Sequence, residues 1–281
     1  MPWQLSDDVG VFADHAWDLL AAGPAEQTVA LTIVESLRAG HRWSDAPALF
    51  GWHLDGADVR GAVCMTPPYE MLLAVVPDEA VPDLVAVLRA EEVQLPGVNG
   101  DVATVERFAA AWREGMALHA RTVFDQRLYA LGTLQPPQPP PPGRARTAAD
   151  GEVDLAARWL RAFQEEAGVP ATDVQSAARA GIGDRRLWLW EDDGGSVVAL
   201  AGRTAPAARV SRVAPVYTPP AFRRRGYGAA VTAACTADAL DRGADHVVLF
   251  TDLANPTSNA IYQRLGYRPV SDRRVLRFEP S

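Results

Sequence analysis

The sequence predicts an α/β protein (α+β) of two lobes, each a mixed, mostly antiparallel sheet flanked by helices. Three observations lead to this fold class. The chain has 281 residues, 48% of them hydrophobic, which suits about two domains with cores of their own. A proline-rich segment lies near its middle. The elements predicted on the two sides of that segment follow a similar order, which indicates an internal repeat.

The proline-rich segment 135–143 is unlike the rest of the chain in composition. Proline removes the backbone donors that a helix interior or a central strand needs. We therefore predict an extended polyproline II spacer, with a docking peptide for an aromatic-lined groove as the alternative. The expected domains are residues 1–134 and 148–281, joined by a linker at 135–147.

Each side of the linker contains a predicted β-hairpin with an Asp-Gly type turn. Each side also ends in a predicted strand whose successive side chains point to opposite faces of the sheet. These segments are 50–67 and 125–131 before the linker, and 187–204 and 272–278 after it. We predict two diverged copies of one fold, unless the likeness is only what any two α/β domains share.

Apolar residues at helical spacing predict helices in both copies. In the first copy they cover Val9–Leu20 and Pro24–Ala39. In the second they cover Val153–Gly168, where Gly168 suits the residue after a helix end.

The composition bounds the class of partner. A net charge of −8 argues against nucleic acid and favours a cationic acceptor such as an amine, although an acidic surface also serves solubility alone. The two cysteines, Cys64 and Cys235, cannot form a disulfide framework or a zinc site, and we expect no metal. No apolar run reaches membrane-spanning length and no signal segment is evident, so we expect a cytoplasmic protein without a membrane partner.

The most informative stretch begins with a predicted strand at 209–218. Pro215 lies inside it and demands an edge position or a bulge, because proline cannot donate to a ladder. A strand that stops pairing midway exposes backbone groups. Those groups could bind an extended ligand that contains amides.

A basic, glycine-containing loop at 223–228 follows and leads into a predicted helix at 229–242. Gly226 and Gly228 lack a Cβ, so backbone N–H groups can approach a phosphate. The helix N-terminus adds unsatisfied donors and partial positive charge, and three arginines add full charges. The loop therefore predicts an anion site, although alone it could also be an exposed turn with solvated arginines.

The remaining elements extend this pattern. A β-branched and aromatic run at 246–251 predicts a buried strand. Asn255 is a predicted N-cap, and Pro256 suits the first position of a helix at 257–265. Tyr262 lies on this helix, seven residues after Asn255.

This order of features resembles the GNAT superfamily of acetyl-coenzyme A dependent acyltransferases. The family motif Gln/Arg-x-x-Gly-x-Gly/Ala is matched by Arg223, Gly226 and Gly228. The family's later Asn, Tyr and Gly-Phe/Tyr are matched by Asn255, Tyr262 and Gly266-Tyr267. The resemblance covers about residues 150–278. The first half lacks the motif, so the resemblance implies a tandem protein with a degenerate GNAT-like N-terminal domain.

The resemblance implies a role for each matching residue. Tyr262 would act as the general acid toward the departing thiolate of coenzyme A. Family members often place a glutamate base on the strand before the loop, but residues 210–217 contain no carboxylate, so Asp252 is the candidate base. Acetyl-CoA would be bound by Val216, Tyr217, Thr218, Arg223, Arg224, Arg225, Gly226, Tyr227, Gly228, Ala229, Asn255 and Ser258.

We therefore expect an acetyltransferase that moves an acetyl group from acetyl-CoA to a small-molecule or peptide amine in a ternary complex. A non-catalytic acyl-CoA sensor and an enzyme with another acyl donor are the alternatives. The chain would be a monomer or a homodimer. In the first half, residues that could wall an acceptor pocket, or simply belong to the core, are Trp43, Trp52, Met65, Tyr69 and Met71.

Overall fold

The structure is a computed structural model that describes residues 2–42 and 44–281. The chain folds into two compact units that are not simple halves of the sequence. The first contains the residues up to 128 together with 251–255 and 270–281, and the second contains 129–250 and 256–269. The domain limits expected from the sequence differ from these units, chiefly because the C-terminal strand belongs to the first unit.

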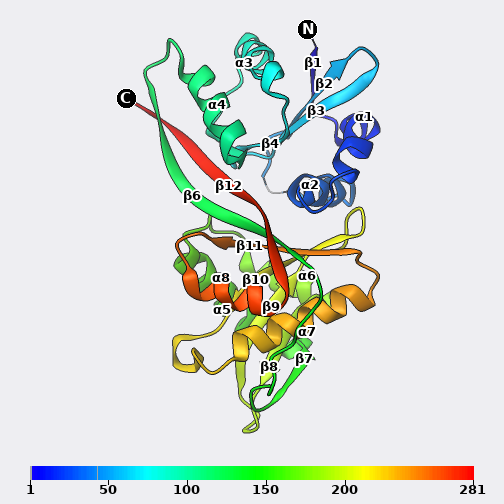
Figure 1. The fold of residues 1–281 in the computed structure, drawn as a ribbon, viewed down its shortest axis with the longest axis vertical. Coiled ribbons are helices and arrows are strands. Elements are labelled where there is room, and N and C mark those ends of the chain that lie inside the picture. Colours follow the sequence, from blue (N-terminus) through cyan, green and yellow to red (C-terminus); the bar gives the residue numbers. More distant parts are fainter. Residues whose placement is uncertain (1, 43) are drawn as a thin grey trace. The chain divides into compact units, whose positions relative to one another are not determined.

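The first unit is built on a mixed sheet (Figure 1). Neighbouring strands are antiparallel except for the parallel pair β4–β5. The strands, in sheet order, are β1 (Trp3–Ser6), β2 (Leu49–Asp55), β3 (Asp58–Met65), β4 (Met71–Val75), β5 (Gly97–Asp101) and β12 (Tyr267–Pro280), followed by β6 (Leu118–Leu131).

Helices cover both faces of this first sheet. On one face α1 packs through a stacked pair, Phe12 and Phe50, whose ring centroids lie 4.9 Å apart. On the other face α3 and α4 bury a core that includes Leu84, Leu88 and Phe108. The short helix η1 (Asp78–Ala80) leads into α3. The helices are α1 (Val9–Ala21), α2 (Thr28–Arg38), α3 (Val81–Ala90) and α4 (Val102–Arg113).

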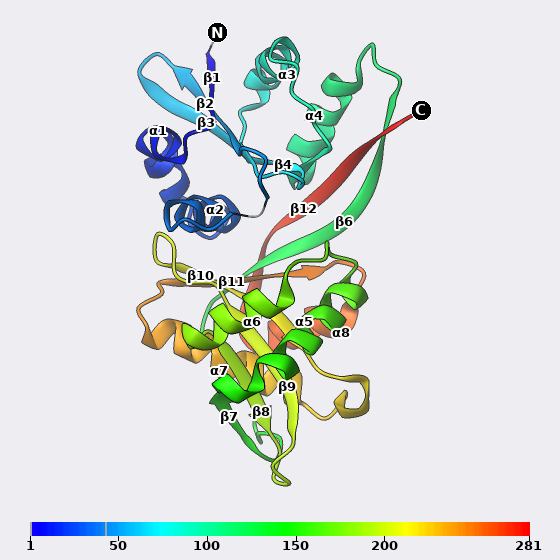
Figure 2. The ribbon, with the colours of Figure 1, turned by 180° about the vertical axis from the view of Figure 1, so that it is seen from behind.

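The second unit repeats the plan. Figure 1 shows α7 and α8 over one face of its sheet, and Figure 2, from behind, shows α5 and α6 over the other. Neighbouring strands are antiparallel except for the parallel pair β10–β11. In sheet order the strands are β11 (His246–Asp252), β10 (Val210–Tyr217), β9 (Val197–Arg203), β8 (Leu187–Glu191) and β7 (Arg144–Thr147); the helices are α5 (Val153–Ala167), α6 (Val174–Gly183), α7 (Tyr227–Asp241) and α8 (Pro256–Arg264).

The two units share one order of strand pairings, three antiparallel and then one parallel, which confirms the predicted fold class. Both predicted hairpins are present as β2–β3 and β8–β9. The predicted helices at 9–20 and 153–168 are α1 and α5, with Gly168 left-handed at the end of α5. The helix predicted from Pro24 starts only at Thr28, because residues 24–27 form turns.

The proline-rich segment belongs to the second unit and packs on it. The indole N–H of Trp190 donates to the carbonyl of Pro142 at 3.0 Å, and the backbone N–H of Gln135 donates to the carbonyl of Leu265 at 2.9 Å. Residues 144–147, expected within the linker, form β7 and pair with β8. Proline cannot donate, but its carbonyl still accepts, so the segment can be held by donors from its neighbours.

The two predicted closing strands also find unexpected partners. β12 ends the chain, yet its residues 273–277 pair with β5 of the first unit. Arg127 of β6 and Asp272 of β12 form a two-bond ion pair at 2.6 and 2.8 Å within that unit. The strand that was expected to close the second copy therefore completes the sheet of the first.

Two further searches cover only the residues that the structure describes. Among residues 2–42 and 44–281, no helix is long and apolar enough to cross a membrane. In the same ranges, no cluster of three or more His, Cys, Asp and Glu residues could hold a metal ion.

Candidate functional site

The site begins where β10 separates from β11. The parallel pairing of the two strands runs from Val210 to Arg212 and then stops. On the other side of β10 the register with β9 shifts between Val213 and Val216, which is the irregularity that Pro215 predicted. The edge of β10 that faces β11 is therefore open from Val213 onward, as a ligand that binds in the manner of a strand requires.

The loop after β10 has the backbone shape of an anion site. Arg224 and Gly226 both have left-handed backbones, at φ +64° and +85°. Gly226 is also the N-cap of α7, so the first free N–H groups of this helix follow it directly. Turns of this kind, ahead of a helix N-terminus, aim several N–H groups at one point. The missing Cβ of Gly228 keeps the loop open, because a Cβ there would crowd the hydroxyl oxygen of Thr218 at 3.1 Å.

The three arginines of the loop divide into two roles. Arg223 donates to the carbonyl of Thr218 at 2.9 Å and forms an ion pair with Glu166 at 2.5 Å, so its charge is engaged within the protein. Arg224 and Arg225 are exposed and form no ion pair with any residue that the structure describes. We therefore assign the shaping of the loop to Arg223, while Arg224 and Arg225 keep their charge available for a ligand.

Helix α5 contributes residues that the sequence did not single out. Glu166 accepts a hydrogen bond from the hydroxyl of Tyr217 at 3.3 Å, and the ring of Trp159 lies 6.1 Å from that of Tyr217. Burial, followed by the charge of Glu166, raises the pKa of Tyr217. Trp159 and Glu166 are seven residues apart, so they share one face of α5, and this helical spacing was the available signal.

Tyr262 is buried on α8, with 9% of its surface exposed. Its ring meets that of Tyr267 edge to face, with centroids 6.2 Å apart. Burial raises the pKa of the Tyr262 phenol to about 12. The group is therefore a neutral hydrogen-bond donor throughout the physiological pH range.

This raised pKa predicts how the rate depends on pH. The neutral, donating form of Tyr262 is present below the raised pKa and is lost only as pH approaches it. We expect the ratio of kcat between the wild type and Tyr262→Phe to stay constant from about pH 7 to about pH 10. Rate profiles of both proteins check this, and a ratio that shrinks toward unity over this range would contradict the assigned pKa.

Three more of the predicted residues lie at or beside the turn between β11 and α8. Asp252 is exposed, and its carboxylate accepts from the backbone N–H of Ala254 at 2.7 Å. Its carbonyl accepts from the N–H of Asn255, which directly precedes Pro256 at the start of α8, as predicted. Asp252 and Asn255 belong to the first compact unit, whereas Ser258 lies half-buried on α8 in the second.

Helix α8 is tied to β6 through a buried tyrosine. The hydroxyl of Tyr129 donates to Oδ1 of Asn259 at 2.9 Å and accepts from Nε2 of Gln263 at 3.1 Å. Asn259 and Gln263 flank Tyr262 along the helix, and Tyr129 is fully buried. These two hydrogen bonds therefore set the rotation of α8 and the direction of the Tyr262 side chain.

The hydrogen bonds of Tyr129 make it a positioning residue. We expect Tyr129→Phe to lower kcat about five-fold, because a lost hydrogen bond costs roughly 1 kcal/mol and that energy corresponds to about this factor in rate. The KM for acetyl-CoA should change little. Steady-state kinetics with both substrates varied measures the two effects separately. If the role of Tyr129 were purely structural, the substitution would lower only the amount of folded enzyme. The kcat per active site, with active sites counted by titration, would then equal the wild-type value.

Comparison with known proteins places this geometry in a family. Residues 154–267, from α5 to the start of β12, match the model of the Acetyltransferase (GNAT) family. This part of the chain is thus similar to the GNAT acetyltransferases. The match spans the splayed strand pair, the positive-φ loop and the helix of Tyr262, and it supports acetyl transfer as the general activity.

Relatives that match most of the chain agree with the GNAT domain. A mycothiol acetyltransferase from Beutenbergia cavernae is 26% identical over 266 residues, which cover 85% of this chain and 88% of the relative. A GCN5-related N-acetyltransferase from Kribbella flavida is 26% identical, with a TM-score of 0.58 over 90% of this chain and 95% of its own. A tandem GNAT protein from the clavulanic acid biosynthesis pathway shares the fold, at 15% identity and a TM-score of 0.57, over 99% of this chain and 98% of its own.

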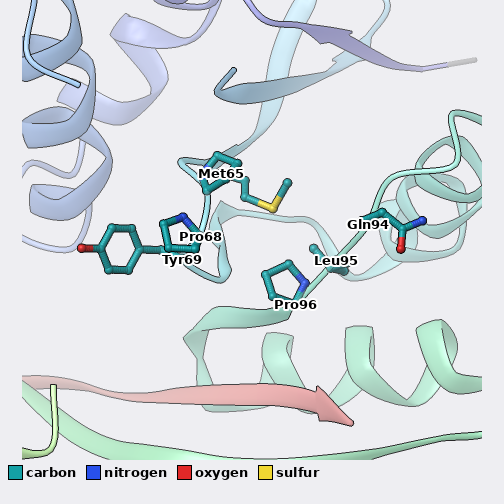
Figure 3. A pocket seen from close by; sticks show the side chains of 7 residues that line it. Met65, Pro68, Tyr69, Gln94, Leu95 and Pro96 are labelled. Atoms are coloured by element: carbon teal, nitrogen blue, oxygen red, sulfur yellow. The ribbon is translucent and has the colours of Figure 1, made fainter. Parts of the chain in front are cut away.

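The first unit has a GNAT-like fold but a different loop in the corresponding place. Between β4 and β5 it has η1 and α3 with no glycine-rich turn. Of its predicted pocket residues, Met65 and Tyr69 line a pocket of about 340 Å³ with three prolines, Gln94 and Leu95 (Figure 3). Trp52 and Met71 are core residues, and Trp43 lies outside the described residues.

Proposed function

We propose that the protein transfers the acetyl group of acetyl-CoA to an amine, by direct attack in a ternary complex. The observation that carries the proposal is one continuous arrangement on the second unit. The open edge of β10 leads into the left-handed loop at Gly226, and this loop leads into the N-terminus of α7.

This arrangement suits an acyl donor with an amide-containing arm and a pyrophosphate. The backbone groups of Val216 and Thr218 would bind the arm as an added strand does. The N–H groups from Arg224 to Ala229, with the charges of Arg224 and Arg225, would hold the pyrophosphate. Asn255 and Ser258 would approach the sulfur end of the arm, as the family resemblance implies.

The chemical step moves protons at both nitrogen and sulfur. An ammonium acceptor first loses one proton, so that its nitrogen lone pair can attack the thioester carbonyl and form the C–N bond. The nitrogen loses a second proton as the tetrahedral intermediate collapses, and this proton balances the one that Tyr262 gives to sulfur. When the C–S bond breaks, the electron pair goes to sulfur, and the Tyr262 phenol donates a proton or a strong hydrogen bond to it. We propose Asp252, the exposed carboxylate at the end of β11, as the group that accepts the proton of the amine.

The state of the cysteines supports direct transfer. Cys64 and Cys235 are both buried, and burial raises the pKa of each thiol to about 12. A nucleophilic cysteine needs an accessible thiolate at neutral pH. Neither thiol meets this requirement, so an acyl-cysteine intermediate has no support in the structure.

The acceptor is proposed at the level of a small-molecule or peptide amine. The name of the Beutenbergia cavernae relative points to mycothiol chemistry for that protein, so the amine precursor of mycothiol belongs in the acceptor panel. We propose a monomer or a homodimer in solution.

Calorimetry with acetyl-, succinyl- and palmitoyl-CoA tests the donor. We expect acetyl-CoA to bind with micromolar affinity and the larger acyl groups to bind more weakly. Tighter binding of succinyl- or palmitoyl-CoA would show that the donor is that acyl-CoA and not acetyl-CoA. Tight binding of acetyl-CoA without thiol release on any amine would instead favour a sensor.

A further inference from the structure

The second unit contains two arginines on neighbouring strands, one buried and one half-buried, and their surroundings differ. Arg203 on β9 is 4% exposed and forms an ion pair with Asp238 of α7 at 2.8 Å. The guanidinium of Arg212 on β10 has a fully buried Nη1 without a hydrogen-bond partner among the residues that the structure describes. Within the same residues, no carboxylate forms an ion pair with Arg212, and the hydrogen bonds with Thr204 involve only the backbone of Arg212.

A buried cation without a partner is costly, because it has given up water and gained no counter-charge. Burial lowers the pKa of Arg212 to about 10, so the group still carries its charge at neutral pH. The buried end of Arg212 is therefore a site that an anion would complete. The planar fork of a guanidinium binds a carboxylate or a phosphate best, through two parallel hydrogen bonds.

The strand register shows which face of the sheet Arg212 occupies. Ser211 is opposite Val247, which packs in the core beneath α7. Arg212 is the next residue on β10, so its side chain leaves the opposite face, the one covered by α5 and α6. Tyr217, farther along β10, lies on this same side against Trp159 of α5.

The position of Arg212 along β10 is equally specific. It forms the last residue pair with β11 before the strands separate. A donor whose pyrophosphate is held at the loop after Thr218 would run back along Val216, so its acyl end would come nearest to this point. Arg212 thus stands where the acceptor has to meet the acyl group.

We propose that Arg212 binds an oxyanion, a carboxylate or a phosphate, on the acceptor, close to the amine that is acetylated. This inference rests on the proposed transfer to an amine and narrows its acceptor class. Amino acids and amine phosphates fit, whereas simple amines without an anionic group leave the Arg212 guanidinium unpaired.

Matched acceptor pairs test the proposal in kinetics. Each of several amino acids is compared with its decarboxylated amine, and ethanolamine phosphate is compared with ethanolamine, at saturating acetyl-CoA. We expect kcat/KM to favour the anionic member by about tenfold or more. Preference for the amino acids identifies a carboxylate, and preference for ethanolamine phosphate identifies a phosphate.

Variants then assign the preference to the arginine. In Arg212→Gln the KM for the anionic acceptor should rise until the preference disappears, while the KM for acetyl-CoA stays the same. Arg212→Lys should retain part of the preference for the anionic acceptor. Equal kcat/KM values of the wild type for acceptors with and without the anionic group would overturn the proposal. So would an Arg212→Gln variant that keeps the preference.

A stability measurement needs no substrate and separates the two proposals. Removing an uncompensated charge should stabilise the free protein, so Arg212→Met should raise Tm by about 2 °C or more. Arg203→Met is the matched control and should lower Tm, because Asp238 loses its buried partner and keeps only the more exposed Arg242. A fall in Tm for Arg212→Met would show a structural role and overturn the inference. A rise in Tm in a protein that acetylates no amine would support the anion site and count against the proposed transfer.

Discussion

Replacing Tyr262 by Phe is expected to lower kcat about 100-fold and to leave the KM for acetyl-CoA nearly unchanged. The phenol is buried, its pKa is raised to about 12, and it is neutral wherever the enzyme is assayed. Its hydrogen bond to sulfur strengthens only as negative charge develops there, so its loss affects the transition state and not the binding of the donor. Release of coenzyme A thiol under saturating substrates measures the effect.

Tyr267→Phe is the matched control for this prediction. Tyr267 is also buried, contacts Tyr262 edge to face, and shares a 2.6 Å hydrogen bond with Thr236. Loss of the Tyr267 hydroxyl should lower the free energy of unfolding by about 1–3 kcal/mol, because the hydroxyl of Thr236 is left unpaired. It should leave kcat unchanged. Equal kcat values in Tyr262→Phe and the wild type would remove the assigned role from Tyr262.

Gly226→Val is expected to raise the KM for acetyl-CoA about tenfold or more. Gly226 has φ +85° at the N-cap of α7, a conformation that costs a residue with a side chain about 1–2 kcal/mol and a β-branched residue more. The loop would relax away from this shape, and its N–H groups would no longer converge on the pyrophosphate. A Cβ at this position would also lie 3.7 Å from Pro141, so part of the new side chain meets the proline-rich segment.

The other end of the same helix provides a control for backbone strain. Gly243 follows α7 with φ +87°, and a Cβ there would have no atom within 4 Å. Gly243→Val should lower Tm by a similar amount and leave the donor KM at its wild-type value. If calorimetry finds that both variants bind acetyl-CoA as the wild type does, the phosphate site is not at this loop.

Much of the second unit could be predicted because its signals are local. Pro215 predicts a break in pairing wherever its strand pairs, since the residue has no N–H, and the break lies between Val213 and Val216. Gly226 can take up a backbone shape that other residues adopt only at a cost, and it does so directly before α7. Pro256 starts α8 as its fixed φ requires.

The partners of buried polar groups could not be predicted in the same way. Arg223 and Glu166 are 57 residues apart, and Tyr129 and Asn259 are 130 apart, so no periodicity relates them. In the sequence Arg223, Arg224 and Arg225 are equivalent, and only the approach of α5 separates the arginine that shapes the loop from the two that stay free. Arg212 is one of 27 arginines in the sequence, and only the structure shows that its Nη1 is buried without a hydrogen-bond partner among the described residues.

By itself, then, the sequence determined the elements, the open strand, the loop and the order of residues that marks the GNAT family, because each depends on neighbours along the chain. Only the tertiary structure decided that β12 pairs with β5, that the proline-rich segment packs on the second unit, and that α8 is held by Tyr129. These contacts join segments that are far apart in the sequence. Their free energy comes from burial and hydrogen bonds that exist only after the chain has folded.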